Sequence, residues 1–318
     1  MSSTTNNEVT HDFPPLGIRA FKDGTVERLK GAEIVPPSTD PITGIRSKDV
    51  VIDPQTGLSA RIYSPKTANP THKKLPLLIY FHGGGFCIET AFSPTYHNYL
   101  NSLAAEANAV IVSVDYRRAP EYPLPIAYDD SWTAIKWVAS HSERGGDEVW
   151  LNDYVDWDEL FFAGDSAGAN IAHNMAVRVG LEGLDGARLV GIALVHAYFW
   201  GKEPIGKEGD NIMGKALAEN LWLFVCPSSS GPDDPLMNPV KDPNFSKLGC
   251  GKVLVCVAEK DMLRDRGWYY KEELEKSGWW GGAVEVMEAG GEGHVFHLSN
   301  PTCENAAAML KRLAAFMN

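Results

Sequence analysis

Apolar runs alternate with stretches of helical period along most of this chain of 318 residues. The clearest runs, 77–81, 109–114 and 189–195, are apolar or aromatic at almost every position rather than at every second one. This pattern is typical of strands buried on both faces of a sheet. Five further runs complete the set of strand candidates: 50–52, 60–63, 160–163, 253–257 and 284–286.

Helices are predicted between these runs, at 96–107, 125–140, 167–179, 266–277 and 303–316. Strand and helix in alternation indicate βαβ units, which form a parallel sheet with helices on both faces. We therefore predict one α/β domain over residues 1–318, with a mostly parallel sheet of eight strands.

Two segments interrupt the alternation. Residues 1–48 are rich in proline and glycine in their later part and have no strong period, so we expect an arm packed on the body. Residues 199–249 form an insertion after the sixth strand, with a helix predicted at 212–224. An insertion there lies over the carboxyl ends of the strands, where open α/β sheets bind ligands.

The sharpest motif is G-x-S-x-G, which occurs as Gly164-Asp165-Ser166-Ala167-Gly168. It directly follows one strand candidate and directly precedes a helix candidate. A serine on such a turn is lifted clear of the sheet, and the helix N-terminus behind it offers N–H groups to negative charge. The pattern also fits an ordinary glycine-rich turn, but its position between strand and helix favours a nucleophile.

A second glycine motif, His82-Gly83-Gly84-Gly85, ends the strand candidate 77–81. Three glycines allow the backbone to approach a substrate and to point N–H groups at it, which suits an oxyanion hole. A phosphate-binding loop of the Walker kind would need a Gly-Lys-Ser/Thr ending, which is absent here. The two glycine motifs together, each after a strand, favour acyl transfer.

A serine nucleophile needs a base, and the base needs an acid to orient it, in the chain order Ser, Asp/Glu, His. Only His294 and His297 follow the seventh strand candidate, and His294 lies in a glycine-rich loop. His297 falls near the last helix and is interpreted as structural. These two histidines lack a third ligand nearby, so we predict no metal site.

The acid is predicted in the turn after the strand 253–257. Asp261 lies at the crest of this turn. Glu259 follows the strand too closely and is expected to pack beside it. Asp265 precedes the helix 266–277 and is expected to cap that helix.

Composition excludes several classes of partner. The net charge of −12 is unfavourable for binding nucleic acid or anionic lipid. No signal peptide and no apolar run long enough to span a membrane is visible. The five cysteines are scattered, which indicates neither a disulfide framework nor a cysteine zinc site. We expect a cytoplasmic protein.

Five motifs together resemble the plant carboxylesterases, in the hormone-sensitive-lipase-like group of α/β-hydrolases. Besides the two glycine motifs they are Asp115–Glu121, Asp261–Asp265 and Gly293–His297. The resemblance extends from about Phe21 to the last helix. Two mild departures, Arg118 where leucine is common and Met262 where proline is common, touch no catalytic atom.

This resemblance implies the α/β-hydrolase fold and a set of site residues. Ser166 is implied as nucleophile, Asp261 as acid and His294 as base. The oxyanion hole is implied to consist of backbone N–H groups in the loop that His82 opens and at the nucleophile: Gly83, Gly84, Gly85 and Ala167. A helical cap is implied over the site, built from the arm (1–48) and the insertion (199–249).

The activity implied is hydrolysis of esters of small apolar or aromatic molecules, with no metal or organic cofactor. A lyase of the 2-hydroxyisoflavanone dehydratase or cyclase type uses the same scaffold and stays open as the alternative. A hormone receptor resembling the gibberellin receptors is disfavoured, because the histidine replaced in those proteins is present here as His294. Five aromatic residues near the insertion suit an apolar substrate or the core of the cap: Tyr198, Phe199, Trp200, Trp222 and Phe224. The sequence predicts no oligomeric state.

Overall fold

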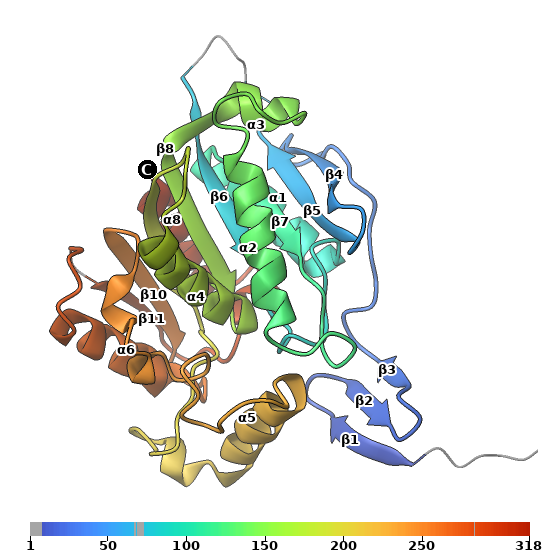
Figure 1. The fold of residues 1–318 in the computed structure, drawn as a ribbon, viewed down its shortest axis with the longest axis vertical. Helices are drawn as coiled ribbons and strands as arrows, with labels where there is room; N and C mark the ends of the chain where they lie inside the picture. The colour runs from blue at the N-terminus through green and yellow to red at the C-terminus, as the bar shows by residue number, and fades with distance from the viewer. Residues whose placement is uncertain (1–7, 67, 69–72, 283) are drawn as a thin grey trace, which may run out of the picture.

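The computed structural model describes residues 8–66, 68, 73–282 and 284–318, so the first seven residues of the predicted arm lie outside it. An eight-stranded sheet has the order β11-β10-β9-β8-β6-β7-β5-β4 (Figure 1). Its strands are β4 (Arg46–Asp53), β5 (Leu58–Ser64), β6 (Leu75–Phe81), β7 (Val110–Asp115), β8 (Val155–Asp165), β9 (Leu189–Val195), β10 (Lys252–Ala258) and β11 (Val284–Ala289). Neighbours from β11 through β7 are parallel, and β7–β5 and β5–β4 are antiparallel. The predicted mostly parallel sheet of eight strands is confirmed.

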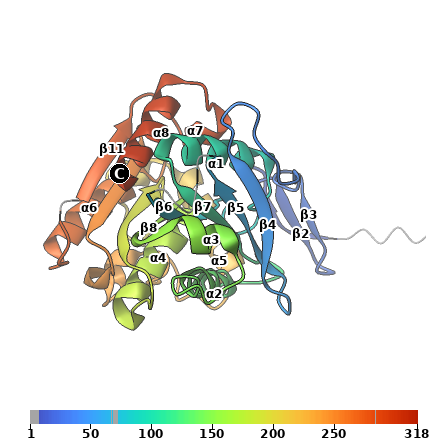
Figure 2. The ribbon, with the colours of Figure 1, turned by 90° about the horizontal axis from the view of Figure 1, so that it is seen from above.

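Helices cover both faces of this sheet (Figure 2). One face carries α1 (Pro94–Ala107) and α8 (Glu304–Met317), and the other carries α2 (Ile126–Ala139), α4 (Ala167–Glu182) and α6 (Arg264–Lys276). Along β6, Leu77 and Ile79 belong to one core while Leu78 and Tyr80 belong to the other. This alternation explains why the run is apolar at successive positions. None of the helices in the described part of the chain has the length and apolar character that crossing a bilayer requires.

The arm is not helical. It forms a separate antiparallel sheet of three short strands, β1 (Val9–Phe13), β2 (Ile18–Phe21) and β3 (Val26–Arg28). Gly17 and Gly24 lie in the turns between them at φ values of 65° and 86°, which favour glycine. Strands of three to five residues are too short for a period to be recognised, so the expectation of a helical contribution from the arm was wrong.

The insertion contains the predicted helix as α5 (Ile212–Val225), preceded by the short helix η1 (Glu208–Asp210) and followed by η2 (Pro239–Lys241) and η3 (Phe245–Lys247). Figure 1 shows α5 and the three-stranded sheet side by side, below the large sheet. The rings of Phe13 and Phe224 join them, with centroids 5.2 Å apart. We call these two segments, residues 8–48 and 199–249, the cap.

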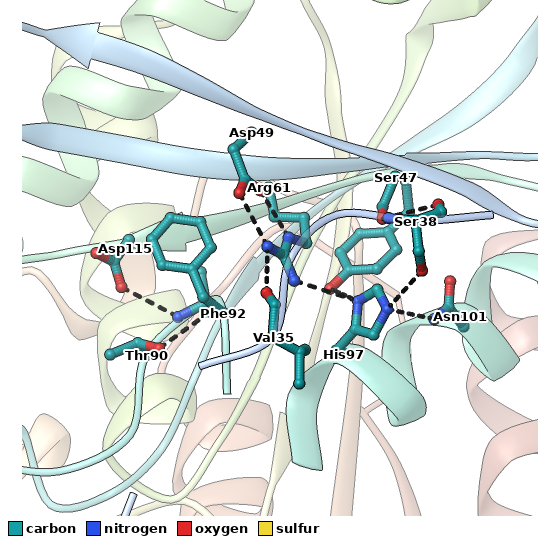
Figure 3. A network of polar contacts seen from close by, with 12 residues as sticks. Val35, Ser38, Ser47, Asp49, Arg61, Thr90, Phe92, His97, Asn101 and Asp115 are labelled. Carbon is teal, nitrogen blue, oxygen red and sulfur yellow. Dashed lines mark hydrogen bonds and ion pairs between the residues drawn. The ribbon is translucent and has the colours of Figure 1, made fainter. Parts of the chain in front are cut away.

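A buried arginine fastens the end of the arm to the sheet (Figure 3). Arg61 of β5 is 1% exposed and forms a two-bond ion pair with Asp49 of β4, at 2.6 and 2.9 Å. It also donates to the backbone carbonyl of Val35 over 2.8 Å. Ser38 contacts His97 of α1 through Oγ and Nε2, 3.3 Å apart. The arm is therefore held by polar bonds at the point where it meets β4.

Candidate active site

Ser166 occupies a strained turn between β8 and α4. Its φ and ψ are 52° and −116°, in the left-handed half of the Ramachandran map, which residues other than glycine rarely adopt. The turn is possible because its flanking glycines lie against backbone: a Cβ on Gly164 would overlap Gly168, and one on Gly168 would overlap the carbonyl of Phe81. The two glycines of the motif are therefore required by packing around the serine.

Three of the predicted residues meet in one hydrogen-bonded row. Ser166 Oγ lies 3.0 Å from Nε2 of His294, and Nδ1 of the same ring lies 2.7 Å from Oδ2 of Asp261. In the neutral ring Nδ1–H donates to the carboxylate, so Nε2 is left to accept the serine proton. The other carboxylate oxygen accepts the N–H of Leu263 at 3.0 Å. Loops after β8, β10 and β11 thus bring together side chains far apart in the sequence.

The electrostatics of the site favour an ion pair between Asp261 and a protonated His294. Burial acts to lower the pKa of His294, but the charge and hydrogen bond of Asp261 outweigh it and raise the pKa above its ordinary value. Burial acts to raise the pKa of Asp261, yet the adjacent imidazole and its hydrogen bonds hold that pKa below the usual range. Asp261 therefore stays ionised beside the ring and stabilises the imidazolium.

A second histidine supports the loop that carries His294. Val295 has φ 48°, a rare value for a β-branched residue, and its N–H donates to Nδ1 of His196 over 2.9 Å. Burial lowers the pKa of His196 to about 3, so this ring stays neutral and keeps Nδ1 free to accept. His196, Asp261 and His294 bring ligand atoms within 4.8 Å of one another, as a metal site would. Of these groups, His294 is bonded to Ser166 and Asp261, and Nδ1 of His196 accepts the N–H of Val295.

The three glycines of the loop that follows His82 differ in what their N–H groups bond to. Gly84 and Gly85, at φ 91° and 60°, line the same cavity as Ser166, and no partner for their N–H groups exists within the described residues. Ala167 begins α4, so its N–H also has no intrahelical partner. The expectation for Gly83 was wrong, because its N–H donates to the hydroxyl of Tyr96 over 2.7 Å. His82 is buried and stacks on Tyr116, with ring centroids 4.2 Å apart.

The other acids of the Asp261 loop have different partners. Asp265 does not cap a helix: α6 begins one residue earlier, and this carboxylate accepts the N–H of Lys207 at 2.8 Å and pairs with Arg264 at 2.7 Å. Glu259 is exposed and accepts the N–H of Gly291. His297 is buried among Tyr99 and His196, in agreement with a structural role.

A cavity of about 590 Å³ opens in front of Ser166. Its walls come from both halves of the cap and from the loops of the body. The arm supplies Pro15 and Leu16, and α5 supplies Leu217, Ala218 and Leu221. The loops of the body supply Ile88, Met262, Leu263 and Val295. Leu298 comes from the short helix α7 (Phe296–Ser299). Glu89, Thr95, Tyr96 and Lys260 are polar residues on the same walls.

Of the five aromatic residues near the insertion, only Tyr198 lines this cavity. Its hydroxyl is used by a bond of 2.6 Å to the carbonyl of Ala218. Phe199 stacks on Tyr270, Trp222 packs on Phe86, and Trp200 and Phe224 are likewise buried. Four of the five therefore belong to the packing of the cap, and aliphatic side chains form most of the apolar wall.

Comparisons with known proteins point to one family. The model of a family described as having the α/β-hydrolase fold matches residues 78–298. The chain is 49% identical to "Probable carboxylesterase 13" of Arabidopsis thaliana, over 98% of both chains. It is 46% identical to a 2-hydroxyisoflavanone dehydratase of Glycyrrhiza echinata, over 99% of this chain and 98% of that one. Among solved structures, an esterase of Pyrobaculum calidifontis is similar, with a TM-score of 0.70 and 28% identity over 86% of this chain and 84% of the other.

Proposed function

The chain belongs to the α/β-hydrolase family, in its plant carboxylesterase group, and from this premise we propose that it hydrolyses carboxylic esters by an acyl-enzyme mechanism. Ser166 is the nucleophile, His294 the general base and Asp261 the acid that orients it. The substrates are esters of small apolar or aromatic molecules.

One observation carries the assignment of roles. Ser166 Oγ, His294 and Asp261 are joined by bonds of 3.0 and 2.7 Å, and the serine faces a cavity of about 590 Å³. A nucleophile within hydrogen-bond reach of a base, itself held by a carboxylate, is the arrangement that serine esterases need. The strained backbone of Ser166 supports the same assignment, because strain of this kind is concentrated at active sites.

The reaction proceeds in two steps. His294 Nε2 takes the proton of Ser166 as Oγ attacks the ester carbonyl, and the N–H groups of Gly84, Gly85 and Ala167 receive the oxyanion. The imidazolium then gives its proton to the departing alkoxide, which leaves as the alcohol. Water attacks the acyl-enzyme with the same base and releases the acid. One donor of such an oxyanion hole contributes about 3 kcal/mol.

We propose that the cap sets the size of the acyl or alcohol group. Its residues Leu16, Leu217 and Leu221 face the serine from two separate segments of the chain. Aliphatic walls of this kind favour apolar groups without orienting them by hydrogen bonds. The cap and the sheet act as one domain over residues 1–318.

A panel of p-nitrophenyl esters with acyl chains of rising length tests the activity. Hydrolysis is expected across the shorter members and should disappear in Ser166→Ala, whose only change is the hydroxyl. A protein that hydrolyses none of the panel, or does so equally well without Ser166, would refute the esterase proposal.

A lyase activity is the second candidate, because two relatives at 46% and 44% identity are named 2-hydroxyisoflavanone dehydratases. The same base and oxyanion donors can promote loss of water from a 2-hydroxyisoflavanone. Supplying that compound beside the ester panel separates the two candidates. Turnover of the 2-hydroxyisoflavanone with little ester hydrolysis would favour the lyase.

We place the enzyme in a reducing compartment such as the cytoplasm. All five cysteines are free, and four of them are buried: Cys87, Cys226, Cys250 and Cys256. One relative at 47% identity is named as mitochondrial, so a fluorescent fusion observed in cells is the direct test of the compartment. Small-molecule esters are the partners that the activity needs; nucleic acid and membranes are not proposed as partners.

A further inference from the structure

Asp165, the residue before Ser166, is a buried carboxylate that the proposed mechanism does not use. It is 1% exposed, and burial raises its pKa to about 6 against the opposing effect of its hydrogen bonds. Two tyrosine hydroxyls serve its two oxygens: Tyr80 donates to Oδ1 at 2.8 Å and Tyr96 to Oδ2 at 2.9 Å. Burial raises the pKa of both phenols, so they remain donors at any ordinary pH.

The two tyrosines differ in one respect. The hydroxyl of Tyr96 also accepts the N–H of Gly83 at 2.7 Å, whereas the hydroxyl of Tyr80 has a hydrogen bond to the carboxylate and to no other group among the described residues. Gly83 directly precedes Gly84 and Gly85, which line the cavity beside Ser166. Its backbone lies so close to Oδ2 of Asp165 that a Cβ on Gly83 would overlap that oxygen.

We propose that Tyr96 and Asp165 are positioning residues. They fix the distance between Ser166 and the oxyanion loop, residues 83–85, which carries the proposed donors Gly84 and Gly85. The bond from Tyr96 joins Asp165, in the turn that carries the nucleophile, to Gly83, in the loop that carries the oxyanion donors. This inference rests on the proposed esterase function and assigns to it two residues that do not take part in the chemistry.

The bridge matters because oxyanion donors act only at short range. Donors must lie about 2.7–3.1 Å from the developing charge, and a displacement of about 1 Å can cost a hundredfold in rate. Without the hydroxyl of Tyr96, the buried N–H of Gly83 has no partner, and the loop is free to shift toward one. Such a shift moves Gly84 and Gly85 away from the oxyanion while the apolar walls of the cavity stay in place.

The chain offers a matched pair of variants. Tyr96→Phe and Tyr80→Phe each remove one hydroxyl, and each takes one hydrogen bond from the same carboxylate. Only Tyr96→Phe also releases Gly83. A purely structural role for these bonds predicts similar losses in the two variants, and a positioning role predicts a large difference between them.

The experiment measures kcat and KM on a short p-nitrophenyl ester, with active sites counted by titration with a fluorophosphonate. We expect Tyr96→Phe to lose about a hundredfold in kcat with little change in KM. Tyr80→Phe is expected to stay within about fivefold of wild type, the effect of one ordinary hydrogen bond. Tyr96→Phe should melt at a somewhat lower temperature than Tyr80→Phe, because it also leaves the buried N–H of Gly83 without a partner, but both should be folded at the assay temperature.

A second readout isolates the oxyanion. A trifluoromethyl ketone adds to Ser166 and places a negative oxygen where the donors point, whereas the corresponding secondary alcohol places no charge there. The inhibition constant of the ketone should rise in Tyr96→Phe in step with the loss of kcat/KM, and that of the alcohol should not change.

Equal losses in the two variants, or a Tyr96→Phe enzyme that binds the ketone as tightly as wild type, would overturn the inference while the esterase proposal stands. If the wild-type protein neither hydrolyses the ester nor reacts with the fluorophosphonate, the esterase proposal itself fails, and this inference fails with it.

Discussion

In the sheet, strands β6, β8 and β9 are buried among apolar side chains on both faces, whereas the cap meets the rest of the protein through apolar contacts, such as that of Trp222 with Phe86, and also through buried arginines. Arg61 holds the arm at Val35. Arg266 of α6 forms a two-bond pair with Glu208 of the insertion, at 2.7 and 2.8 Å, and both side chains are almost completely buried.

The difference between the two regions matches a difference in function. The sheet supplies every residue to which we assign chemistry, on turns whose geometry depends on close packing. The cap supplies only walls to the cavity, from segments that apolar packing and polar bonds together hold against the sheet. A change in the sheet turns should therefore abolish turnover, and a change in the cap should alter stability or selectivity instead.

The largest expected effect tests the sheet side of this contrast. Ser166→Ala removes the proposed nucleophile and should lower kcat by about a millionfold. The backbone bonds of residue 166 to Val195 and Tyr198 remain, so circular dichroism and the melting temperature should change little. Ester hydrolysis that persists near the wild-type rate would show that the chemistry lies elsewhere.

Asp261→Asn comes next and should lower kcat by about ten-thousandfold, because the amide stabilises the wrong tautomer of His294. Asp265→Asn is the matched control four residues away. An asparagine can still accept the N–H of Lys207, and Arg264 keeps Glu288 as a partner at 2.8 Å, so activity should remain near wild type. If the control loses its activity and Asp261→Asn keeps it, the assignment of the acid is wrong.

Arg266→Met probes how the cap is attached. It leaves Glu208 buried without its partner and should reduce the free energy of unfolding by about 3–5 kcal/mol in urea denaturation. Arg19→Met breaks an arm pair whose side chains are 42% and 40% exposed, and should cost less than about 1 kcal/mol. Equal losses in the two variants would contradict the view that the insertion depends on a buried pair.

Leu16→Ala tests selectivity. Leu16 lines the cavity from the arm, so its truncation removes apolar contact with long acyl groups. We expect kcat/KM for an octanoate ester to fall about tenfold relative to that for an acetate ester. An equal fall in kcat/KM for both esters would show that Leu16 supports the catalytic residues and does not select the acyl group.

The smallest effect is on the pH profile. The proposed base, His294, must be neutral to act, and Asp261 raises its pKa, so kcat/KM should fall on the acid side with a midpoint above the ordinary histidine value of 6.5. In Asp261→Asn that support is lost, and the midpoint of the residual activity should move to lower pH. A midpoint that stays at the same pH in both proteins would mean that another group limits the acid side.

Sequence patterns predicted the sheet far better than the cap. All eight strands were predicted, and the central ones were visible because burial on both faces leaves a run such as 189–195 almost free of polar residues. The outer strands β4 and β11 are partly exposed. The arm gave no such signal, since β1, β2 and β3 are short and partly exposed. Bonds such as that of Arg61 to Val35 join residues 26 positions apart, and no local pattern encodes them.

In the site too, residues that belong to a local sequence pattern were predicted, and contacts between distant residues were not. Ser166, Asp261 and His294 were predicted because each follows a strand in a motif or glycine-rich turn, and the structure brings them together. Gly83 was misassigned because the partner of its N–H, Tyr96, lies on a helix 13 residues away and carries no motif. Asp265 was misassigned because α6 begins at Arg264, a shift of two residues from the predicted start.

The open sheet has an outer strand, β4, whose unpaired backbone could in principle recruit a strand from another molecule. Three features of the chain discourage this. The arm covers the beginning of β4, where the N–H of Ser47 donates to the carbonyl of Ser38 at 2.8 Å. The strand carries the charged residues Arg46, Lys48 and Asp49, and its register shifts between Val51 and Asp53. The segment that leads from the cap to the sheet thereby also guards the protein against edge-to-edge aggregation.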